Sequence, residues 1–212
     1  MEVTVAPQFE DAQQQQEAST LGMWIFLATE ILFFGAMFLG YTVYRAMYPQ
    51  AFGEASRHLD IVLGSVNTAV LLCSSLTMAL AVHAAQIGIR RMLVLFLVVT
   101  MLLGGLFLGI KFYEYYEKYG EGLIPGSQFT WSGSNPQHAS LFFIFYFVMT
   151  GMHALHMLVG VGLMMTLITL ARRNKFSRIY YTPVEVGGLY WHFVDIVWVF
   201  LFPLLYLVDR SR

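Results

Sequence analysis

The sequence has little charge and almost no cysteine. Only 12% of its 212 residues are Asp, Glu, Lys or Arg, and ordinary soluble domains carry about twice that fraction. The formal net charge is −1, so no basic surface for nucleic acid is expected. Cys73 is the single cysteine, which excludes an internal disulfide and any cysteine-based zinc or iron–sulfur cage. Too few charges remain to cover the surface of a soluble protein.

Apolar residues are abundant instead. They make up 58% of the chain, with 18 Phe, 12 Tyr and 12 Met among them. A membrane accommodates them, because a helix needs about 20 mostly apolar residues to cross it. Such segments lie at about 21–44, 61–89, 92–110, 139–171 and 186–208. Backbone polar groups in lipid must be bonded within their own segment, so we predict an all-α bundle of five transmembrane helices.

Polar sequence precedes and separates these segments. Residues 1–19 include four acids and no Lys or Arg, so they lack the basic start of a signal peptide and form a polar, Gln-rich lead-in. Residues 113–138, rich in aromatic residues, Gly and Pro, are predicted to be the one substantial aqueous loop. Since no repeat or soluble module is visible, residues 20–212 are predicted to form one membrane domain.

The loop charges leave the orientation of the chain open. With the N-terminus inside, the inner side would hold Arg90, Arg91, Arg172, Arg173, Lys175 and Arg178. The outer side would hold Arg45, Arg57, Lys111, Lys118, Arg210 and Arg212. These counts are equal, so the positive-inside rule does not decide between the two orientations. The dense cluster at 172–178 favours an inner N-terminus and an outer C-terminus.

Ionisable residues inside these segments are the candidate functional residues, because one at mid-bilayer costs about 3 kcal/mol or more. Glu30 lies about 15 Å into the first segment at the rise of an α-helix. It can be a protonated acid bonded to a neighbouring helix, or it can serve a proton- or lipid-related role. The sequence alone leaves both interpretations open.

Two further pairs have the i, i+3 spacing that places side chains on one helix face. His153 and His156 form either a hydrogen-bonded helix contact or half of a metal site, whose other ligands would come from elsewhere. His192 and Asp195 can share a proton or form an ion pair, which would fix helix packing. The paired Glu-x-x-His motifs of di-iron bundles are absent.

Small residues predict where helices meet. Gly105 and Gly109 form a GxxxG step, and Gly151, Ala154 and Gly160 give the fourth segment a thin face. The sequence contains no Walker loop, no G-x-S-x-G elbow and no dinucleotide fingerprint. No active site for a soluble substrate is therefore expected.

Three stretches of sequence carry a family resemblance. They are LGMWIFLATEILFFGAMFLGYTVYR at 21–45, MTGMHALHMLVGVG at 149–162 and VEVGGLYWHFVDIVWVFLFPLLY at 184–206. The first resembles the glutamate-bearing helix of subunit 3 of the haem–copper respiratory oxidases, and the second its T-G-x-H-x-x-H-x-x-x-G helix. The third is similar to its closing E-x(4)-Y-W-H-F-V-D-x-V-W helix. The resemblance runs from about residue 20 to 208, and KFYEYYEK at 111–118 fits the end of the family's preceding helix.

The resemblance implies the five-helix form found in bacterial plasma membranes, with a cytoplasmic N-terminus and an outer C-terminus. It implies no catalytic residue and no metal in this chain, with haem and copper held by partner subunits. Subunit 1 would be the direct partner, beside subunit 2, other respiratory subunits and membrane lipids, with no nucleic acid. The proton- or lipid-related residues implied are Glu30, His153, His156, Glu185, Tyr190, Trp191, His192 and Asp195.

The resemblance also implies a role: phospholipid bound in a cleft, support of proton uptake, and protection of the catalytic centre during turnover. Two N-terminal helices that form one wall of the cleft in the mitochondrial form are missing, so another subunit would supply that wall. Subunit 3 of a proton-pumping cytochrome c oxidase is the leading function. A quinol oxidase subunit or a nitric oxide reductase accessory subunit is the alternative within the superfamily.

Two alternatives belong to other classes of protein. One is an intramembrane metal oxygenase built on the histidines, which would bind iron or copper stoichiometrically. The other is a small proton-coupled transporter that uses Glu30 and Asp195, which would not copurify with haem-bearing subunits.

Overall fold

The computed structural model of the protein describes residues 7–126, 129–178 and 180–207. Within these ranges five helices are long and apolar enough to cross a membrane, which confirms the predicted fold class. They are α1 (Ala12–Met47), α3 (Ile61–Gln86), α4 (Arg90–Gly120), α5 (Pro136–Arg172) and α6 (Thr182–Tyr206). A short helix, α2 (Pro49–Ser56), joins α1 to α3.

Local chemistry sets where the helices begin and end. Asp11 caps α1, since its Oδ1 accepts a hydrogen bond from the backbone N–H of Gln14 at 2.7 Å. Asp60 caps α3 in the same way. The tight turn after α3 uses Gly88 with φ +76°, a left-handed conformation that favours glycine. Pro136 occupies the first turn of α5, where its missing N–H is not needed.

The two largest differences between predicted and observed helix boundaries lie at the start of α1 and at the end of α4. The lead-in predicted over 1–19 is helical from residue 12 and continuous with α1, because Asp11 starts the helix there. The helix predicted over 92–110 runs on to residue 120, and α5 begins at residue 136. The prediction of an aqueous loop over 113–138 is therefore wrong for its first eight and its last three residues. That stretch stays helical because Lys111, Glu114 and Lys118 turn inward and are nearly fully buried.

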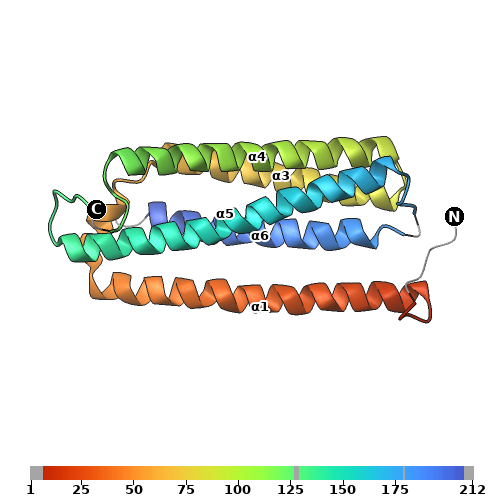
Figure 1. Ribbon diagram of the computed structural model, residues 1–212, viewed down its shortest axis with the longest axis horizontal. Helices are drawn as coiled ribbons and strands as arrows, with labels where there is room; N and C mark the ends of the chain where they lie inside the picture. The colour runs from red at the N-terminus through yellow and green to blue at the C-terminus, as the bar shows by residue number, and fades with distance from the viewer. Residues whose placement is uncertain (1–6, 127–128, 179, 208–212) are drawn as a thin grey trace.

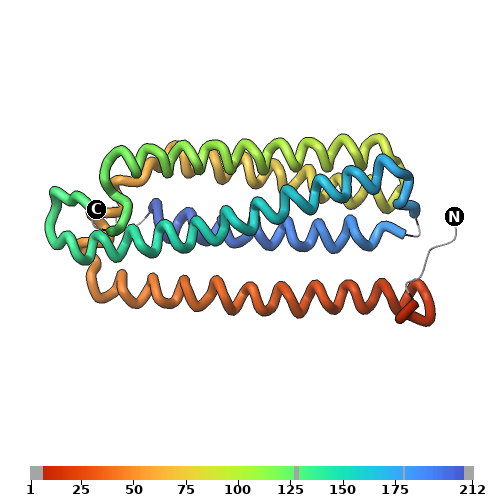
Figure 2. The backbone as a smooth tube through the Cα atoms, viewed as in Figure 1, coloured from red at the N-terminus to blue at the C-terminus, as the bar shows by residue number. Residues whose placement is uncertain are grey.

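The transmembrane helices do not pack equally. Helices α3, α4, α5 and α6 each contact two of the others and form the body of the bundle, whereas α1 lies along α5 and α6 on one side (Figure 1). The backbone trace shows α5 running obliquely across the bundle (Figure 2). Only 11% of the most apolar window of α1 is buried inside the chain, against 56% for α6. Most of α1 therefore faces the surroundings of the protein.

Small residues make room for one large side chain at the centre of the bundle. Trp191 of α6 is fully buried, and a Cβ added to Gly104 or Gly160 would lie 2.6 Å or 2.9 Å from its ring. The thin face predicted around Gly160 is thus a real helix contact. The prediction for the GxxxG step is wrong within the described chain, because Gly105 and Gly109 have nothing within 4 Å of an added Cβ.

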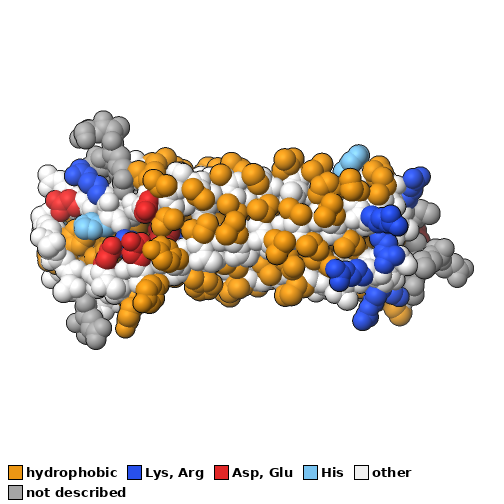
Figure 3. All heavy atoms as spheres, turned by 90° about the horizontal axis from the view of Figure 1, so that it is seen from above, with side chains coloured by type: hydrophobic (Ala, Val, Ile, Leu, Met, Phe, Trp, Pro, Cys, Tyr) orange, Lys and Arg blue, Asp and Glu red, His pale blue; other side chains and the backbone are white. Residues whose placement is uncertain are grey.

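The two ends of the bundle differ in charge. Lys and Arg gather at the end with the α3–α4 turn and the α5–α6 connection, and Asp and Glu gather at the opposite end on the face shown (Figure 3). Hydrophobic side chains cover the long middle section between them (Figure 3). This banded surface is the distribution expected of a membrane-spanning bundle.

Candidate functional site within the helix bundle

Glu30 of α1 and His156 of α5 are hydrogen-bonded between helices, with Glu30 Oε2 3.1 Å from His156 Nε2. His156 Nδ1 lies 2.8 Å from the carbonyl oxygen of Met152, so Nδ1 carries a hydrogen and donates it. Nε2 then either accepts a hydrogen bond from a protonated Glu30 or donates one to its carboxylate. In both forms the pair shares one proton and has no net charge, which lowers the cost of placing it in a membrane.

Aromatic side chains surround this pair. The Phe34 ring meets the His156 ring edge-on at 5.3 Å, and the Tyr190 hydroxyl donates to the His156 carbonyl oxygen at 2.9 Å. Phe26 of α1 stacks on Tyr190 of α6. The side chains of Glu30 and His156 remain 19% and 13% exposed, so the pair is partly open to the surroundings of the protein. Glu30, His156 and Tyr190 therefore lie together, at the junction of three helices.

His153 occupies a different interface from His156. Its ring lies between Phe107 of α4 and Trp198 of α6, with centroid distances of 5.4 Å and 5.2 Å, and the residue is 1% exposed. Neither ring nitrogen has a hydrogen-bond partner among the described residues. Residues three apart on a helix point about 60° apart, which is enough here to send the two imidazoles to different neighbours. Within the described ranges, no three His, Cys, Asp or Glu side chains gather as a metal site.

The predicted pairing of His192 with Asp195 is wrong. His192 Nδ1 lies 2.8 Å from the Ser75 hydroxyl of α3, which is its partner instead. Asp195 is 3% exposed, and neither of its carboxyl oxygens has a hydrogen-bond partner in the described part of the chain. Glu185, at the start of α6, accepts a hydrogen bond from the Gln86 amide at the end of α3 at 3.3 Å. These three residues of the closing helix are therefore not bonded to one another, and His192 and Glu185 contact different residues of α3.

Helix α3 supplies hydroxyl groups to the tryptophans of α6. The Trp191 indole N–H donates to the Ser74 hydroxyl and the Trp198 indole N–H to the Thr68 hydroxyl, both at 3.1 Å. Buried indoles need an acceptor for their single N–H. The tryptophans of the closing motif thus fix the position of α6 along the axis of α3.

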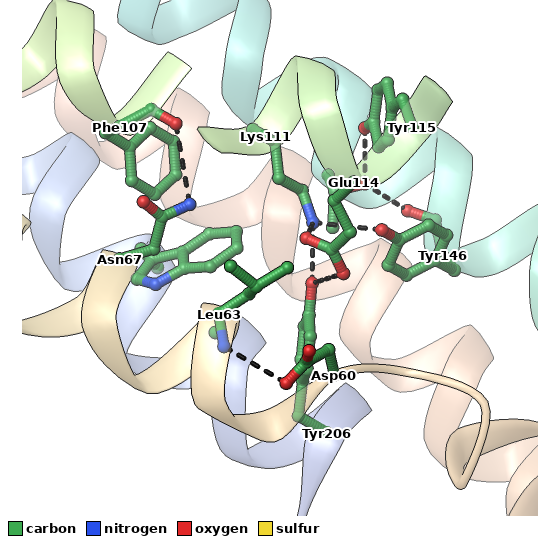
Figure 4. Close-up of polar contacts among 12 residues, drawn as sticks. Asp60, Leu63, Asn67, Phe107, Lys111, Glu114, Tyr115, Tyr146 and Tyr206 are labelled. Carbon is green, nitrogen blue, oxygen red and sulfur yellow. Dashed lines mark hydrogen bonds and ion pairs between the residues drawn. The ribbon is translucent and has the colours of Figure 1, made fainter. Parts of the chain in front are cut away.

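A buried polar cluster joins α4, α5 and α6 (Figure 4). Lys111 Nζ lies 2.9 Å from Glu114 Oε2 and donates to the hydroxyls of Tyr206 at 2.6 Å and Tyr146 at 3.1 Å. The Tyr206 hydroxyl in turn donates to Glu114 Oε1 at 2.6 Å. Lys111 and Glu114 are each 1% exposed, so the cation and the acid neutralise each other inside the protein.

Aromatic rings complete the environment of this lysine. The ammonium lies 4.7–5.4 Å from the ring centroids of Tyr115, Tyr146, Trp198 and Tyr206, within the distance at which ring faces attract a cation. Our sequence predictions missed the cluster. The i, i+3 spacing of Lys111 and Glu114 directly after an apolar run was its only local signal, because Tyr146 and Tyr206 lie far along the chain.

Taken together, the geometry defines a class of protein: an integral membrane bundle whose ionisable groups face other helices and join them. A family model narrows that class, since the model for cytochrome c oxidase subunit III matches residues 6–209. The chain belongs to this family, which confirms the resemblance seen in its motifs.

Curated relatives match nearly the full chain. Cytochrome c oxidase subunit 3 of Thermostichus vulcanus is 30% identical over 204 residues, covering 94% of this chain and 92% of the relative. That of Corynebacterium diphtheriae is 31% identical over 210 residues, covering 96% and 95%. Quinol oxidase subunit 3 of Bacillus spizizenii is 30% identical over 189 residues, covering 89% and 86%. The chain is thus similar to subunits of oxidases named for two different electron donors.

Proposed function

We propose that this chain is subunit 3 of a proton-pumping cytochrome c oxidase, in direct contact with subunit 1 and beside subunit 2. The haem and copper of the reaction belong to those partner subunits. The Glu30–His156 pair carries the proposal, because it is a proton-sharing group placed between helices on the least covered side of the bundle. Such a pair can hold α1 in place beside a proton-pumping partner without performing electron transfer.

The exposed surface of α1 supports a role in assembly. Ile25, Leu32 and Leu39 on this helix are 58%, 74% and 66% exposed. A membrane-spanning helix that contacts its own bundle along one side only has most of its surface available to lipid or to a partner helix. Membership in a subunit family of a multi-subunit oxidase provides such partners.

A groove at the N-terminal end of α1 supports lipid binding. Its volume is about 830 Å³, and it lies between the first turns of α1 and the start of α6. Leu21 and Trp24 give it apolar surface, while Gln13, Tyr180 and Thr182 give it polar groups. This combination suits a phospholipid at the membrane interface, with the headgroup on the polar residues and an acyl chain along α1.

The charge distribution supports a bacterial plasma-membrane subunit with its N-terminus in the cytoplasm and its C-terminus outside. Lys111 and Lys118 belong to α4 and pair with Glu114 and Glu121, so they are not loop charges. Removing them from the count leaves the α3–α4 and α5–α6 end as the more basic one. By the positive-inside rule, this excess of cations favours a cytoplasmic position for that end and for the start of α1.

Purification of the native complex through a tag on this chain tests the proposal. The expected result is a complex with haem absorbance that oxidises reduced cytochrome c. Oxidation of quinol but not of cytochrome c would identify a quinol oxidase subunit instead, which the Bacillus spizizenii relative makes the second candidate. Recovery of the chain without haem-bearing partners would contradict both and favour a transporter.

A further inference from the structure

Six cationic side chains lie at one end of the bundle. They are Arg90, Arg91, Arg172, Arg173, Lys175 and Arg178, and they come from the α3–α4 turn and the α5–α6 connection. Within the described residues none of them forms an ion pair with a carboxylate. The acids described at this end are on the first turns of α1 and at Glu185, which is bonded to Gln86. The cluster therefore carries positive charge that the described side chains do not neutralise.

Two of these arginines are fixed in place by backbone carbonyls. Arg90 donates through Nε to the carbonyl oxygen of Ala171 at 2.8 Å, and its guanidinium also reaches the carbonyl oxygen of Arg172. Arg178 donates through Nε to the carbonyl oxygen of Ile87 at 2.8 Å. The two connections are thereby tied together, and the guanidinium groups are held in fixed positions instead of moving freely in solvent.

Gly88 makes room for this arrangement. A Cβ at this position would lie 2.8 Å from Arg178 Cγ and 3.0 Å from its Nε, and the backbone φ of +76° favours glycine as well. The turn thus requires glycine both for its conformation and for the close approach of the arginine.

A small pocket opens between the two arginines. Its volume is about 140 Å³, and Arg90, Ser177 and Arg178 are its polar lining. Its apolar lining comes from Ala84, Ala85, Leu93, Ala171 and Phe176, with Gly88 at the turn. Two guanidinium groups and one hydroxyl around a pocket of this size suit a group with several acceptor oxygens, such as a phosphate.

The start of α4 adds to the positive charge. Arg90 and Arg91 occupy its first turn, which contains no acid, and no side chain caps the helix there. The backbone N–H groups at a helix N-terminus favour anions and disfavour cations. Two arginines at this position therefore increase the attraction for an anion from outside the chain.

We infer that this basic pocket binds the phosphate group of an anionic phospholipid. Apolar side chains also line the pocket, among them Leu93 and Phe176, and Ile89, next to Arg90, is 46% exposed. They provide a surface for acyl chains that a free phosphate ion would not use. Basic pockets between membrane helices on the cytoplasmic side are recognised sites for anionic headgroups. The site lies on α3, α4 and α5, away from the groove at the start of α1.

Lipid retention by the intact oxidase complex tests the inference. The complex is exchanged into nanodiscs of phosphatidylcholine with a minor fraction of phosphatidylglycerol, returned to detergent, and its bound lipids are counted by native mass spectrometry. We expect phosphatidylglycerol to be retained in preference to phosphatidylcholine. We expect Arg178→Gln to lower that retention about fivefold, since one cation near an anionic surface contributes about 1 kcal/mol. Arg178→Lys should retain most of it.

Lys175→Gln is the matched control, because it removes the same charge at the same end but does not line the pocket. An equal loss in that variant would show diffuse attraction and overturn the inference. A wild-type complex that retains both lipids equally would overturn it without any variant. Thermal stabilisation by inorganic phosphate as large as that by phosphatidylglycerol would identify a free-phosphate site instead. None of these results depends on which electron donor the oxidase uses.

Discussion

At the scale of single residues, the bonding partner of a polar side chain in the bundle depends on which helix that side chain faces. The sequence placed Glu30, His156 and His192 in long apolar helices, as the structure does, because a charged or imidazole side chain is conspicuous in an apolar run. It could not identify their partners. Glu30 and His156 are far apart in the sequence, and the partner of His192 is Ser75 of α3. Spacing along one helix predicts which residues share a face, whereas packing decides which neighbour each one meets.

Glu30→Gln tests the role of the proton shared with His156. Glutamine preserves the size and hydrogen-bonding ability of the side chain but cannot exchange a proton at neutral pH. We expect the initial rate of oxygen consumption to stay close to that of the wild type, while activity declines sooner over successive turnovers. Oxygen-electrode progress curves of the purified complex measure both quantities.

Glu117→Gln is the control for this variant, since Glu117 is exposed near the end of α4 and lines neither of the two proposed lipid sites. It should leave the whole progress curve unchanged. Immediate loss of haem reduction in Glu30→Gln would show that the pair takes part in electron transfer and would contradict its proposed role.

At the scale of helices, the five spans follow from the sequence because apolar length alone determines them. Their ends are harder to predict. The extension of α4 to residue 120 depends on burial of Lys111 and Glu114, which in turn depends on Tyr146 of α5 and Tyr206 of α6. From the sequence alone, the charged stretch at 111–118 after an apolar run resembles the start of a loop. Its burial becomes evident only when the contacts with α5 and α6 are known.

Lys111→Met tests whether the buried cluster stabilises the bundle. Removing the cation leaves Glu114 buried without its counter-charge, and such a change typically costs about 3–5 kcal/mol. We expect a large drop in the free energy of unfolding, measured by denaturant titration of the chain in detergent. The double variant Lys111→Met, Glu114→Leu should recover much of it, because two apolar side chains need no partner. A double variant no more stable than the single one would argue against this account.

Gly104→Ala tests the packing of Trp191. The added methyl would lie 2.6 Å from the indole, whereas the same change at Gly105 would meet nothing within 4 Å. Overpacking of this kind costs about 1–3 kcal/mol. We therefore expect Gly104→Ala to lower the midpoint of thermal unfolding in detergent and Gly105→Ala to leave it nearly unchanged. Equal effects would show that helix propensity, and not the contact with Trp191, determines stability here.

At the scale of the whole molecule, the family could be predicted from three motifs in the correct order, while the raw count of loop charges left the orientation open. The raw count of loop cations is equal on both sides, and the structure changes it by pairing Lys111 with Glu114 and Lys118 with Glu121. The sequence count assigned Arg210 and Arg212 to the outer side of the membrane, but these two residues are not among those that the structure describes. A cation paired with a carboxylate of its own chain adds little to the positive-inside count, and only the structure shows which cations are paired.

Cysteine labelling tests the proposed orientation. Cys73 is the only native cysteine, so Cys73→Ser gives a background without thiols. In intact cells, a membrane-impermeant maleimide should label Ser132→Cys in the α4–α5 loop but not Lys175→Cys in the α5–α6 connection. Both positions are exposed in the structure, so a difference in labelling would report the side of the membrane on which each position lies. The reverse labelling pattern would place the N-terminus outside.

The most direct test of the central claim is the metal and haem content of the oxidase with and without this chain. We expect the complex stripped of the chain to keep its haem and copper and its initial rate, and to lose activity sooner during turnover. We expect the isolated chain to contain neither iron nor copper in stoichiometric amount. Loss of haem from the stripped complex together with metal in the isolated chain would show that the membrane histidines bind a redox centre.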